Sequence, residues 1–163
     1  MPPEPIDPIR PTDDEARALA RRLLSEARHA ALGVIEPETG GPFVTRVAVG
    51  WDGGAALVLV STLSQHTRAL RAEPASSLLL GEPGPRGDPL THPRLTLLTR
   101  AEPADKAVHR ASWLAQHPKA GLYYDFADFL MLRLVVRSAF LNGGFGKAFR
   151  LTPDDLRPPA GAA

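Results

Sequence analysis

The sequence predicts a mainly β fold, an antiparallel sheet that is closed or nearly closed and is flanked by helices. Two observations favour it. Segments with the pattern of strands outnumber those with the pattern of helices, and short turns join consecutive strands. No internal repeat is evident in the 163 residues, and a chain of this length is expected to form one domain with a sizeable core.

The N-terminal part is expected to be an arm followed by a helix. Residues 1–11 are rich in proline and are expected to be extended or disordered. Thr12 to Glu15 has the pattern of a capping box, with Thr12 as N-cap and Glu15 at the third helical position. The leucines and alanines that follow, as far as about Arg28, have the spacing of one buried helical face.

The middle of the chain has the pattern of strands joined by turns. Strands are expected over residues 30–35, 43–51, 55–61, 75–81 and 94–101, with a short helix over 64–72. The first three strands form an antiparallel meander, in which Asp52-Gly53-Gly54 is a hairpin turn. A long loop rich in proline and glycine covers residues 82–93.

The C-terminal part combines one longer helix with the last strands. The helix is expected over 103–116, with Pro103 near its start and Pro118 just past its end. The last strands are expected over 126–136 and 139–151, and Thr152 opens a short helix. The domain therefore spans 12–156, and residues 157–163 form a tail.

Composition narrows the classes of function. The absence of cysteine removes disulfides, thiolate nucleophiles and cysteine-based metal sites. A net charge of +1 does not indicate a nucleic-acid or membrane partner. The N-terminus lacks a basic start followed by an apolar core, and no apolar run reaches membrane-spanning length. A soluble, cytoplasmic protein is expected.

The stretch from Ala56 to Leu70, ALVLVSTLSQHTRAL, carries the strongest functional signal. An apolar strand ends in Ser61-Thr62, and a helix restarts with hydroxyls and Arg68 in its first turn. A helix N-terminus offers unpaired N–H groups and the positive end of a dipole, which suit a phosphate. The alternative is an ordinary strand-to-helix turn, with Ser64 as N-cap and Arg68 in solvent.

Arg46 is a second candidate ligand of a phosphate. In FVTRVAV, alternation puts Phe43, Thr45 and Val47 on one face and Arg46 on the other. Adjacent antiparallel strands would allow Arg46 to lie near Ser61 and Arg68, where two guanidinium groups and hydroxyls fit a dianion. The alternative is an arginine on the solvent side of a sheet.

Other catalytic patterns are absent from the sequence. The five histidines, among which His66 lies in the candidate phosphate turn, lack the short spacings of a metal site. No serine lies in a G-x-S-x-G elbow. NGGFGK at 142–147 lacks the spacing and the hydroxyl of a nucleotide-triphosphate loop.

Several motifs together resemble one known superfamily. They are the AALGVI strand, the P-x-V-T-R-V strand, LVSTLSQHTRAL, GDPLTHPRLTLLTRA, HPKA…Y…DF over 117–126 and NGGFGKAFRL over 142–151. This order is similar to the flavin-binding split barrels, the pyridoxamine 5′-phosphate oxidase-like superfamily, and within it to the haem-utilisation (HugZ-like) branch. The resemblance covers about residues 16–156.

The resemblance implies a six-stranded split β-barrel that works as a homodimer, with FMN in two clefts at the subunit interface. It implies that the FMN phosphate is held by Arg46 and by the turn Ser64, Gln65, His66, Thr67 and Arg68. It places Val47, Ser61 and Thr62 along the ribityl chain and the edge of the flavin ring. Arg94 matches the region that reaches FMN from the other subunit, and Lys147 is a further candidate near the ring.

Two departures from the family leave the activity open. The chain ends in AFRLTPDDLRPP and lacks the C-terminal segment with which pyridoxamine phosphate oxidases bind flavin and substrate, so vitamin B6 oxidation is not expected. It also stops before the extra domain of the haem-degrading relatives. An FMN-dependent oxidoreductase acting on a small molecule, and a flavin- or haem-binding protein without turnover, are the two hypotheses. Deazaflavin is a further candidate cofactor.

Overall fold

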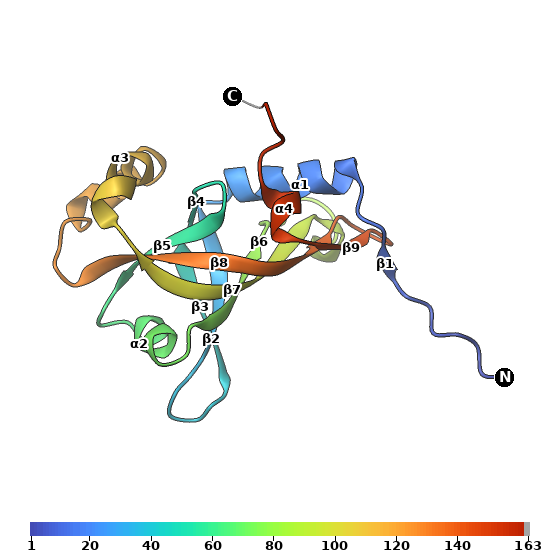
Figure 1. Ribbon diagram of the computed structural model, residues 1–163, viewed down its shortest axis with the longest axis horizontal. Helices are drawn as coiled ribbons and strands as arrows, with labels where there is room; N and C mark the ends of the chain where they lie inside the picture. Colours follow the sequence, from blue (N-terminus) through green and yellow to red (C-terminus); the bar gives the residue numbers. More distant parts are fainter. Residues whose placement is uncertain (162–163) are drawn as a thin grey trace.

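The computed structural model describes residues 1–161 and places the strands in one twisted sheet with helices around it (Figure 1). The strands are β1 (Ile9–Arg10), β2 (His29–Ile35), β3 (Pro42–Ala48), β4 (Gly50–Trp51), β5 (Ala55–Ser61), β6 (Ala75–Leu80), β7 (Arg94–Ala104), β8 (Phe129–Asn142) and β9 (Ala148–Leu151). The α-helices are α1 (Asp14–Glu26), α2 (Gln65–Ala72), α3 (Lys106–Gln116) and α4 (Pro153–Leu156), and two 3₁₀ turns are η1 (Pro89–Thr91) and η2 (Pro118–Leu122). Within residues 1–161, no helix is long and apolar enough to cross a membrane.

Strand β8 pairs with three other strands of the sheet. It pairs with β7 along one edge, and on its other edge with β5 in its first half and β9 in its second half. The sheet continues from β7 through β6 and β2 to β3, and β4 pairs with β5. Six strands of six residues or more, namely β2, β3, β5, β6, β7 and β8, form its body. The mainly β class is confirmed, and the sheet is open rather than closed.

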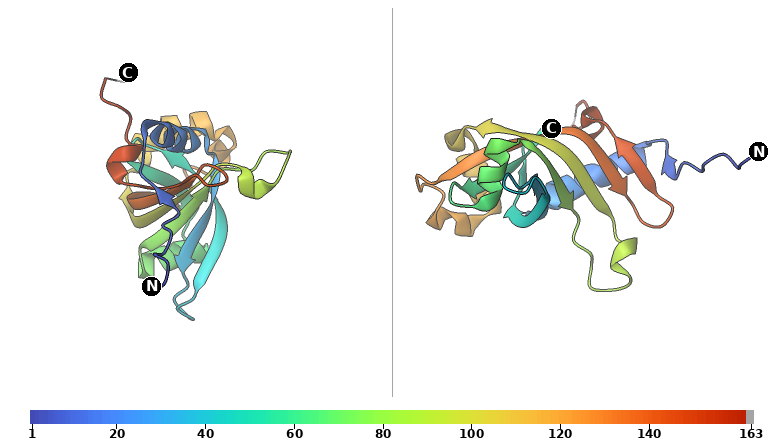
Figure 2. Two further views of the ribbon diagram at one scale, coloured as in Figure 1. Left: turned by 90° about the vertical axis from the view of Figure 1, so that its right-hand side faces the viewer. Right: turned by 90° about the horizontal axis from the view of Figure 1, so that it is seen from below.

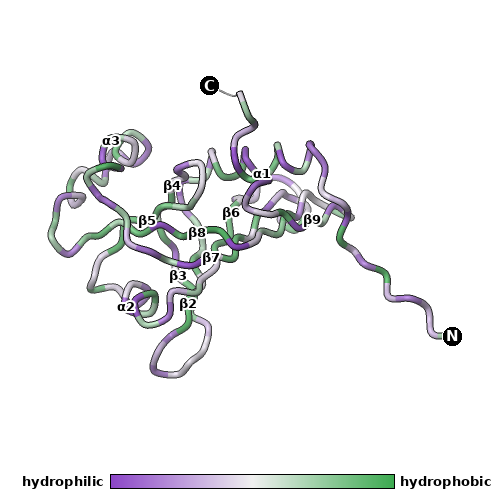
Figure 3. The backbone as a smooth tube through the Cα atoms, viewed as in Figure 1, coloured by the Kyte–Doolittle hydropathy of each residue, from purple (hydrophilic) through white to green (hydrophobic). Residues whose placement is uncertain are grey.

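The core lies on both sides of β5, which explains why Ala55 to Val60 is buried without alternation. Val58 faces the main core inside the curved sheet, whereas Leu59 packs with Trp113 and Tyr124 of the α3–η2 region. Figure 3 shows this hydrophobic run along β5. Packing on both faces therefore holds β5 in place, and with it the turn that joins β5 to α2.

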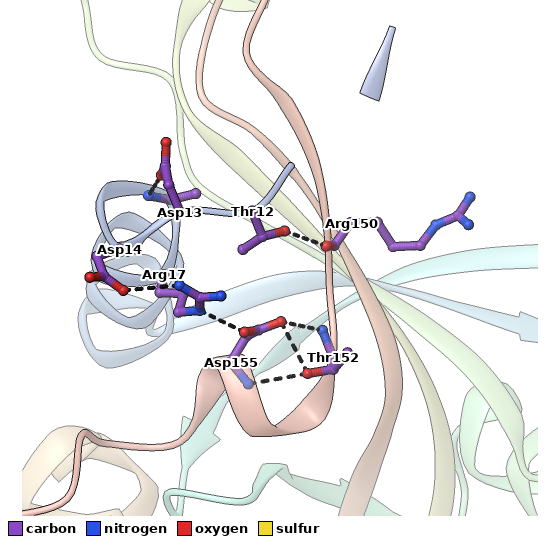
Figure 4. Close-up of polar contacts among 8 residues, drawn as sticks. Thr12, Asp13, Asp14, Arg17, Arg150, Thr152 and Asp155 are labelled. Atoms are coloured by element: carbon purple, nitrogen blue, oxygen red, sulfur yellow. Dashed lines mark hydrogen bonds and ion pairs between the residues drawn. The ribbon is translucent and has the colours of Figure 1, made fainter. Parts of the chain in front are cut away.

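Helix α1 is fixed to the C-terminal end of the chain by polar contacts (Figure 4). Its N-cap is Asp13, whose carboxylate accepts from the Ala16 N–H at 2.8 Å, so the predicted cap at Thr12 is wrong. The Thr12 hydroxyl instead donates to the Arg150 carbonyl at 2.7 Å. The Arg17 guanidinium donates to Asp155 at 2.7 Å. Tertiary contacts therefore decide between two neighbouring residues that both suit a cap.

The capping box that was expected on α1 is found on α4. The Thr152 hydroxyl accepts from the Asp155 N–H, and the Asp155 carboxylate accepts from the Thr152 N–H. The short helix expected after Thr152 is thereby confirmed.

Several strand boundaries differ from those expected. Strand β7 continues through Pro103, which pairs with Leu132 of β8, and α3 begins only at Lys106 after the N-cap Asp105. The pairing of β6 with β7 ends at Arg100, so the missing N–H of Pro103 faces an unpaired edge. The two strands expected over 126–136 and 139–151 are one long β8 and the short β9.

The expected strand over 43–51 is divided, because β3 ends at Ala48 and β4 begins at Gly50. The N-terminal arm joins the sheet at its end, where β1 pairs in parallel with β9. The loop between β6 and β7 projects from the body of the molecule (Figure 2).

The hairpin at Asp52 predicts a pH-dependent contribution to stability. The Asp52 carboxylate accepts from the N–H groups of Gly54 and Ala55 at 2.8 and 2.6 Å, and from Arg133 at 2.9 Å. Burial raises the pKa of Asp52, but the hydrogen bonds from Arg133, Gly54 and Ala55 outweigh it and the pKa lies below its usual value. A carboxylate with a lowered pKa stabilises the fold above its unfolded pKa of about 4, and that contribution is lost as pH falls through the folded pKa.

We therefore expect Asp52→Asn to lower the free energy of unfolding at pH 7 by about 1 kcal/mol. The difference from the unsubstituted protein narrows as pH falls below about 4. Urea unfolding at a series of pH values measures it, with Glu38→Gln, at an exposed acid in a turn, as control. A deficit of the same size at every pH would contradict this role for the charge.

Candidate functional site

The start of α2 is an uncapped helix N-terminus. Ser64 is its N-cap, but the Ser64 side chain makes no capping hydrogen bond. The first helical hydrogen bond is from the Arg68 N–H to the Ser64 carbonyl. The N–H groups of Gln65, His66 and Thr67 therefore have no acceptor within the helix. Among the four α-helices within residues 1–161, α2 alone lacks a side-chain cap.

Two side chains of the first turn of α2 are turned into the protein. Thr67 is fully buried, and its hydroxyl has no hydrogen-bond partner within the described residues. His66 is half-buried, and its Nδ1 lies 3.1 Å from the Thr45 hydroxyl of β3. Burial lowers the pKa of His66, so this imidazole is neutral at pH 7. An orphaned buried hydroxyl has an energetic cost unless a ligand satisfies it.

The turn before α2 is held by Asp128. The Ser61 hydroxyl donates to the Asp128 carboxylate at 2.9 Å and accepts from the Leu63 N–H, while the Thr62 N–H donates to the Asp128 carbonyl. These bonds fix Ser61 and Thr62 in place. No local pattern in the sequence points to Asp128, because it is brought close by the register that pairs Ser61 with Phe129.

The two arginines expected at a phosphate lie on different sides of β3. Arg68 is exposed on α2 and has no ion pair among residues 1–161. Thr45 makes the contact between β3 and α2, and the next residue, Arg46, leaves the strand on the opposite, outer face. In the part of the chain that the structure describes, no hydrogen bond joins Arg46 to α2. The same alternation buries Val47, which is 6% exposed, in the core.

Arg94 and Lys147 lie at the other end of the molecule. Arg94 pairs with Asn142 at the end of β8, and its guanidinium donates to the Leu90 carbonyl at 2.9 Å. Lys147 is exposed in the turn between β8 and β9. Ser61 pairs with Phe129, the first residue of the 14-residue β8, so the two groups are separated by roughly 40 Å of strand. One copy of the chain does not bring all the expected residues together.

The fold is that of a known class of split barrels. A solved protein from Clostridium acetobutylicum, described as related to general stress protein 26 and of the pyridoxinephosphate oxidase family, superposes with a TM-score of 0.69. It is 16% identical, over 89% of this chain and 99% of its own. No protein-family model matches the chain.

Two proteins with higher sequence identity to this chain have names that refer to haem. The haem-binding protein from Mycobacterium smegmatis is 30% identical with a TM-score of 0.81, over 91% of this chain and 61% of its own. The chloroplastic non-canonical haem oxygenase HOZ of Arabidopsis thaliana is 36% identical over 100 residues. That match covers 59% of this chain and 30% of the oxygenase, so the chain spans less than two thirds of either relative. The chain therefore has the fold of the pyridoxamine 5′-phosphate oxidase-like split barrels, and its similarity to the two proteins named for haem fits the haem-utilisation branch.

Proposed function

We propose that the chain binds FMN, with the phosphate at the N-terminus of α2. The uncapped first turn carries this proposal, because the N–H groups of Gln65, His66 and Thr67 and the Thr67 hydroxyl are donors without partners among the described residues. Arg68, a cation on the same helix, has no ion pair within residues 1–161. Donors of this kind match the oxygens of a phosphate dianion.

We propose further that a second copy completes the site. The outer face of the sheet carries Arg46 on β3, Leu79 on β6 and Leu98 on β7, and Leu79 and Leu98 are exposed. Arg94 lies on this face too, because Thr96 two residues on pairs with Leu79. An exposed apolar sheet face with arginines at its margins fits a symmetric contact with another copy of the chain.

In such a dimer, Arg94 and Lys147 of one copy would approach the flavin of the other. This arrangement would bring residues from opposite ends of β8 into one site. This proposal rests on the cleft between two subunits that the resemblance to the split barrels implies. The separation of the two groups along β8 supports it, because one copy of the chain does not bring them together.

The function that we propose is that of an FMN-dependent oxidoreductase acting on a small molecule. Bound flavin supplies the transfer of hydride or single electrons. The chain itself holds the phosphate, orients the ring and excludes water. His66 lies in the proposed phosphate turn, and as a neutral imidazole bonded to Thr45 it adds no charge there.

Haem binding is the second candidate function. The names of the Mycobacterium smegmatis and Arabidopsis thaliana relatives favour it. Histidine is the commonest protein ligand of haem iron in globins and peroxidases. Three of the five histidines already hold a hydrogen bond at a ring nitrogen: His66 to Thr45, His92 to Gly84 and His117 to Val49. His92 is bonded at both ring nitrogens, the second to the Arg86 carbonyl, whereas His66 and His117 are each bonded at one nitrogen and keep the other for an iron ligand.

Replacing Thr67 with valine tests the phosphate site. Removal of an unpartnered buried hydroxyl is expected to raise the free energy of unfolding by about 1 kcal/mol. Loss of a neutral hydrogen bond to the phosphate is expected to weaken FMN binding about fivefold. Urea unfolding and quenching of FMN fluorescence measure the two effects.

Thr99→Val is the matched control for Thr67→Val. Thr99 is also buried, but its hydroxyl bonds to Ser76, so this variant is expected to lose stability and to keep its affinity for FMN. An unchanged affinity in Thr67→Val would place the phosphate elsewhere.

A further inference from the structure

A second hollow lies far from α2, between α1, β1 and the turn that joins β8 to β9. We call it the α1–β9 cleft. Its volume is about 190 Å³, and Leu19 of α1 and Phe149 of β9 form the apolar part of its lining. Its lining residues come from α1 and β1 near one end of the chain and from β9 near the other, and Figure 1 shows these elements close together.

The cleft is built by contacts between distant segments. Parallel pairing of Ile9 with Ala148 sets Arg10 beside the turn, where its guanidinium lies 3.8 Å from the position that a Cβ of Gly146 would occupy. A Cβ at Gly143 would meet Leu19 at 3.4 Å, so the turn packs closely on α1. The bonds of Thr12 and Arg17 fix the helix on the other side (Figure 4).

The rim of the cleft carries three cations. Arg10, Arg22 and Lys147 come from three different segments. None of their side chains has a hydrogen bond or ion pair within residues 1–161, whereas the neighbouring Arg17 is bonded to Asp14 and Asp155.

Two carboxylates also line the cleft, Asp13 and Glu15. The Asp13 carboxylate is engaged as the N-cap of α1, and Glu15 is exposed on the first turn. The rim therefore keeps an excess of positive charge, and its cations are the groups available to a ligand.

We propose that the α1–β9 cleft binds a small carboxylate with an apolar body of about the size of benzene. The volume is slightly above that of an apolar cavity of about 150 Å³ that takes up benzene in another protein. Leu19 and Phe149 offer a surface for the apolar body, and Arg10 and Arg22 offer donors for the carboxylate. This site is distinct from the proposed phosphate site, since it lies at the β9 end of β8.

Benzoate is the probe, and benzyl alcohol is its uncharged match. Calorimetric titration of the purified protein is expected to give one benzoate site with a Kd on the order of 1 mM, and benzyl alcohol is expected to bind at least about tenfold more weakly. In NMR spectra, the amide signals of Gly143 and Lys147 are expected to shift with benzoate. No binding below about 10 mM, equal binding of both probes, or shifts confined to other regions would overturn the proposal.

Substitutions locate the charge contacts. Arg10→Gln and Arg22→Gln are each expected to weaken benzoate binding about tenfold, since each removes a charge-assisted hydrogen bond. Arg137→Gln, at an exposed arginine of β8 outside the cleft, is the control and is expected to leave the Kd unchanged. Equal effects of all three variants would show that net charge alone controls benzoate binding, and would overturn the proposed site.

Added FMN separates this site from the flavin site. Benzoate is expected to bind with the same Kd with and without saturating FMN, whether or not the protein proves to use flavin. Displacement of FMN by benzoate would overturn the assignment of benzoate to the α1–β9 cleft.

Discussion

Arg68→Glu is expected to weaken FMN binding by at least about a hundredfold. The variant removes a charge-assisted hydrogen bond worth about 1.5–3 kcal/mol and puts a carboxylate beside a dianion. Arg68 is exposed and has no ion pair in the part of the chain that the structure describes, so the fold should tolerate the change. Fluorescence titration with FMN measures the affinity, and thermal unfolding checks that the protein remains folded.

Arg71→Glu is the matched control for Arg68→Glu. Arg71 is an exposed arginine on the same helix, in its last turn and away from the uncapped N-terminus. This variant has the same change in net charge and is expected to lower the affinity only slightly through long-range repulsion. Equal losses in both variants would mean that the overall charge, not a phosphate site at α2, controls binding.

Leu98→Asp is expected to weaken self-association by at least about a thousandfold. Leu98 lies at the middle of the outer sheet face and is 41% exposed. A two-fold symmetric contact would bury the new carboxylate twice, and each buried, unpaired carboxylate costs several kcal/mol. Light scattering over a range of concentrations measures the change from dimer to monomer.

Val108→Asp on α3 is the control for Leu98→Asp, since Val108 is 72% exposed and lies off the outer face. It is expected to leave the dimer intact. A Leu98→Asp protein that remains dimeric would place the interface elsewhere. An unsubstituted monomer that binds flavin stoichiometrically would contradict the shared cleft.

Local patterns predicted much of this fold because they depend on neighbours in the sequence. Asp52-Gly53-Gly54 gives the hairpin, Ser64 begins α2, and alternation in β3 places Arg46 opposite Thr45. The long β8, in contrast, passes through positions where the sequence predicts a break, because β5, β7 and β9 all pair with it.

The candidate site was only partly predictable for the same reason. The hydroxyls and Arg68 of the turn are visible in the sequence as a local motif. The orphaned state of Thr67 and the bond from Ser61 to Asp128 depend on tertiary packing, which no local pattern encodes. Which residues of a second copy complete the site follows from the resemblance to the split barrels and stays a prediction.

A visible absorption spectrum of the purified protein, repeated after addition of FMN and then of haemin, tests flavin binding most directly. We predict a flavin band that bleaches when a reductant is added. A haem Soret band without a flavin band would contradict the proposed cofactor and favour the haem-binding function. The absence of both bands after the two additions would contradict cofactor binding altogether, and with it the proposed oxidoreductase.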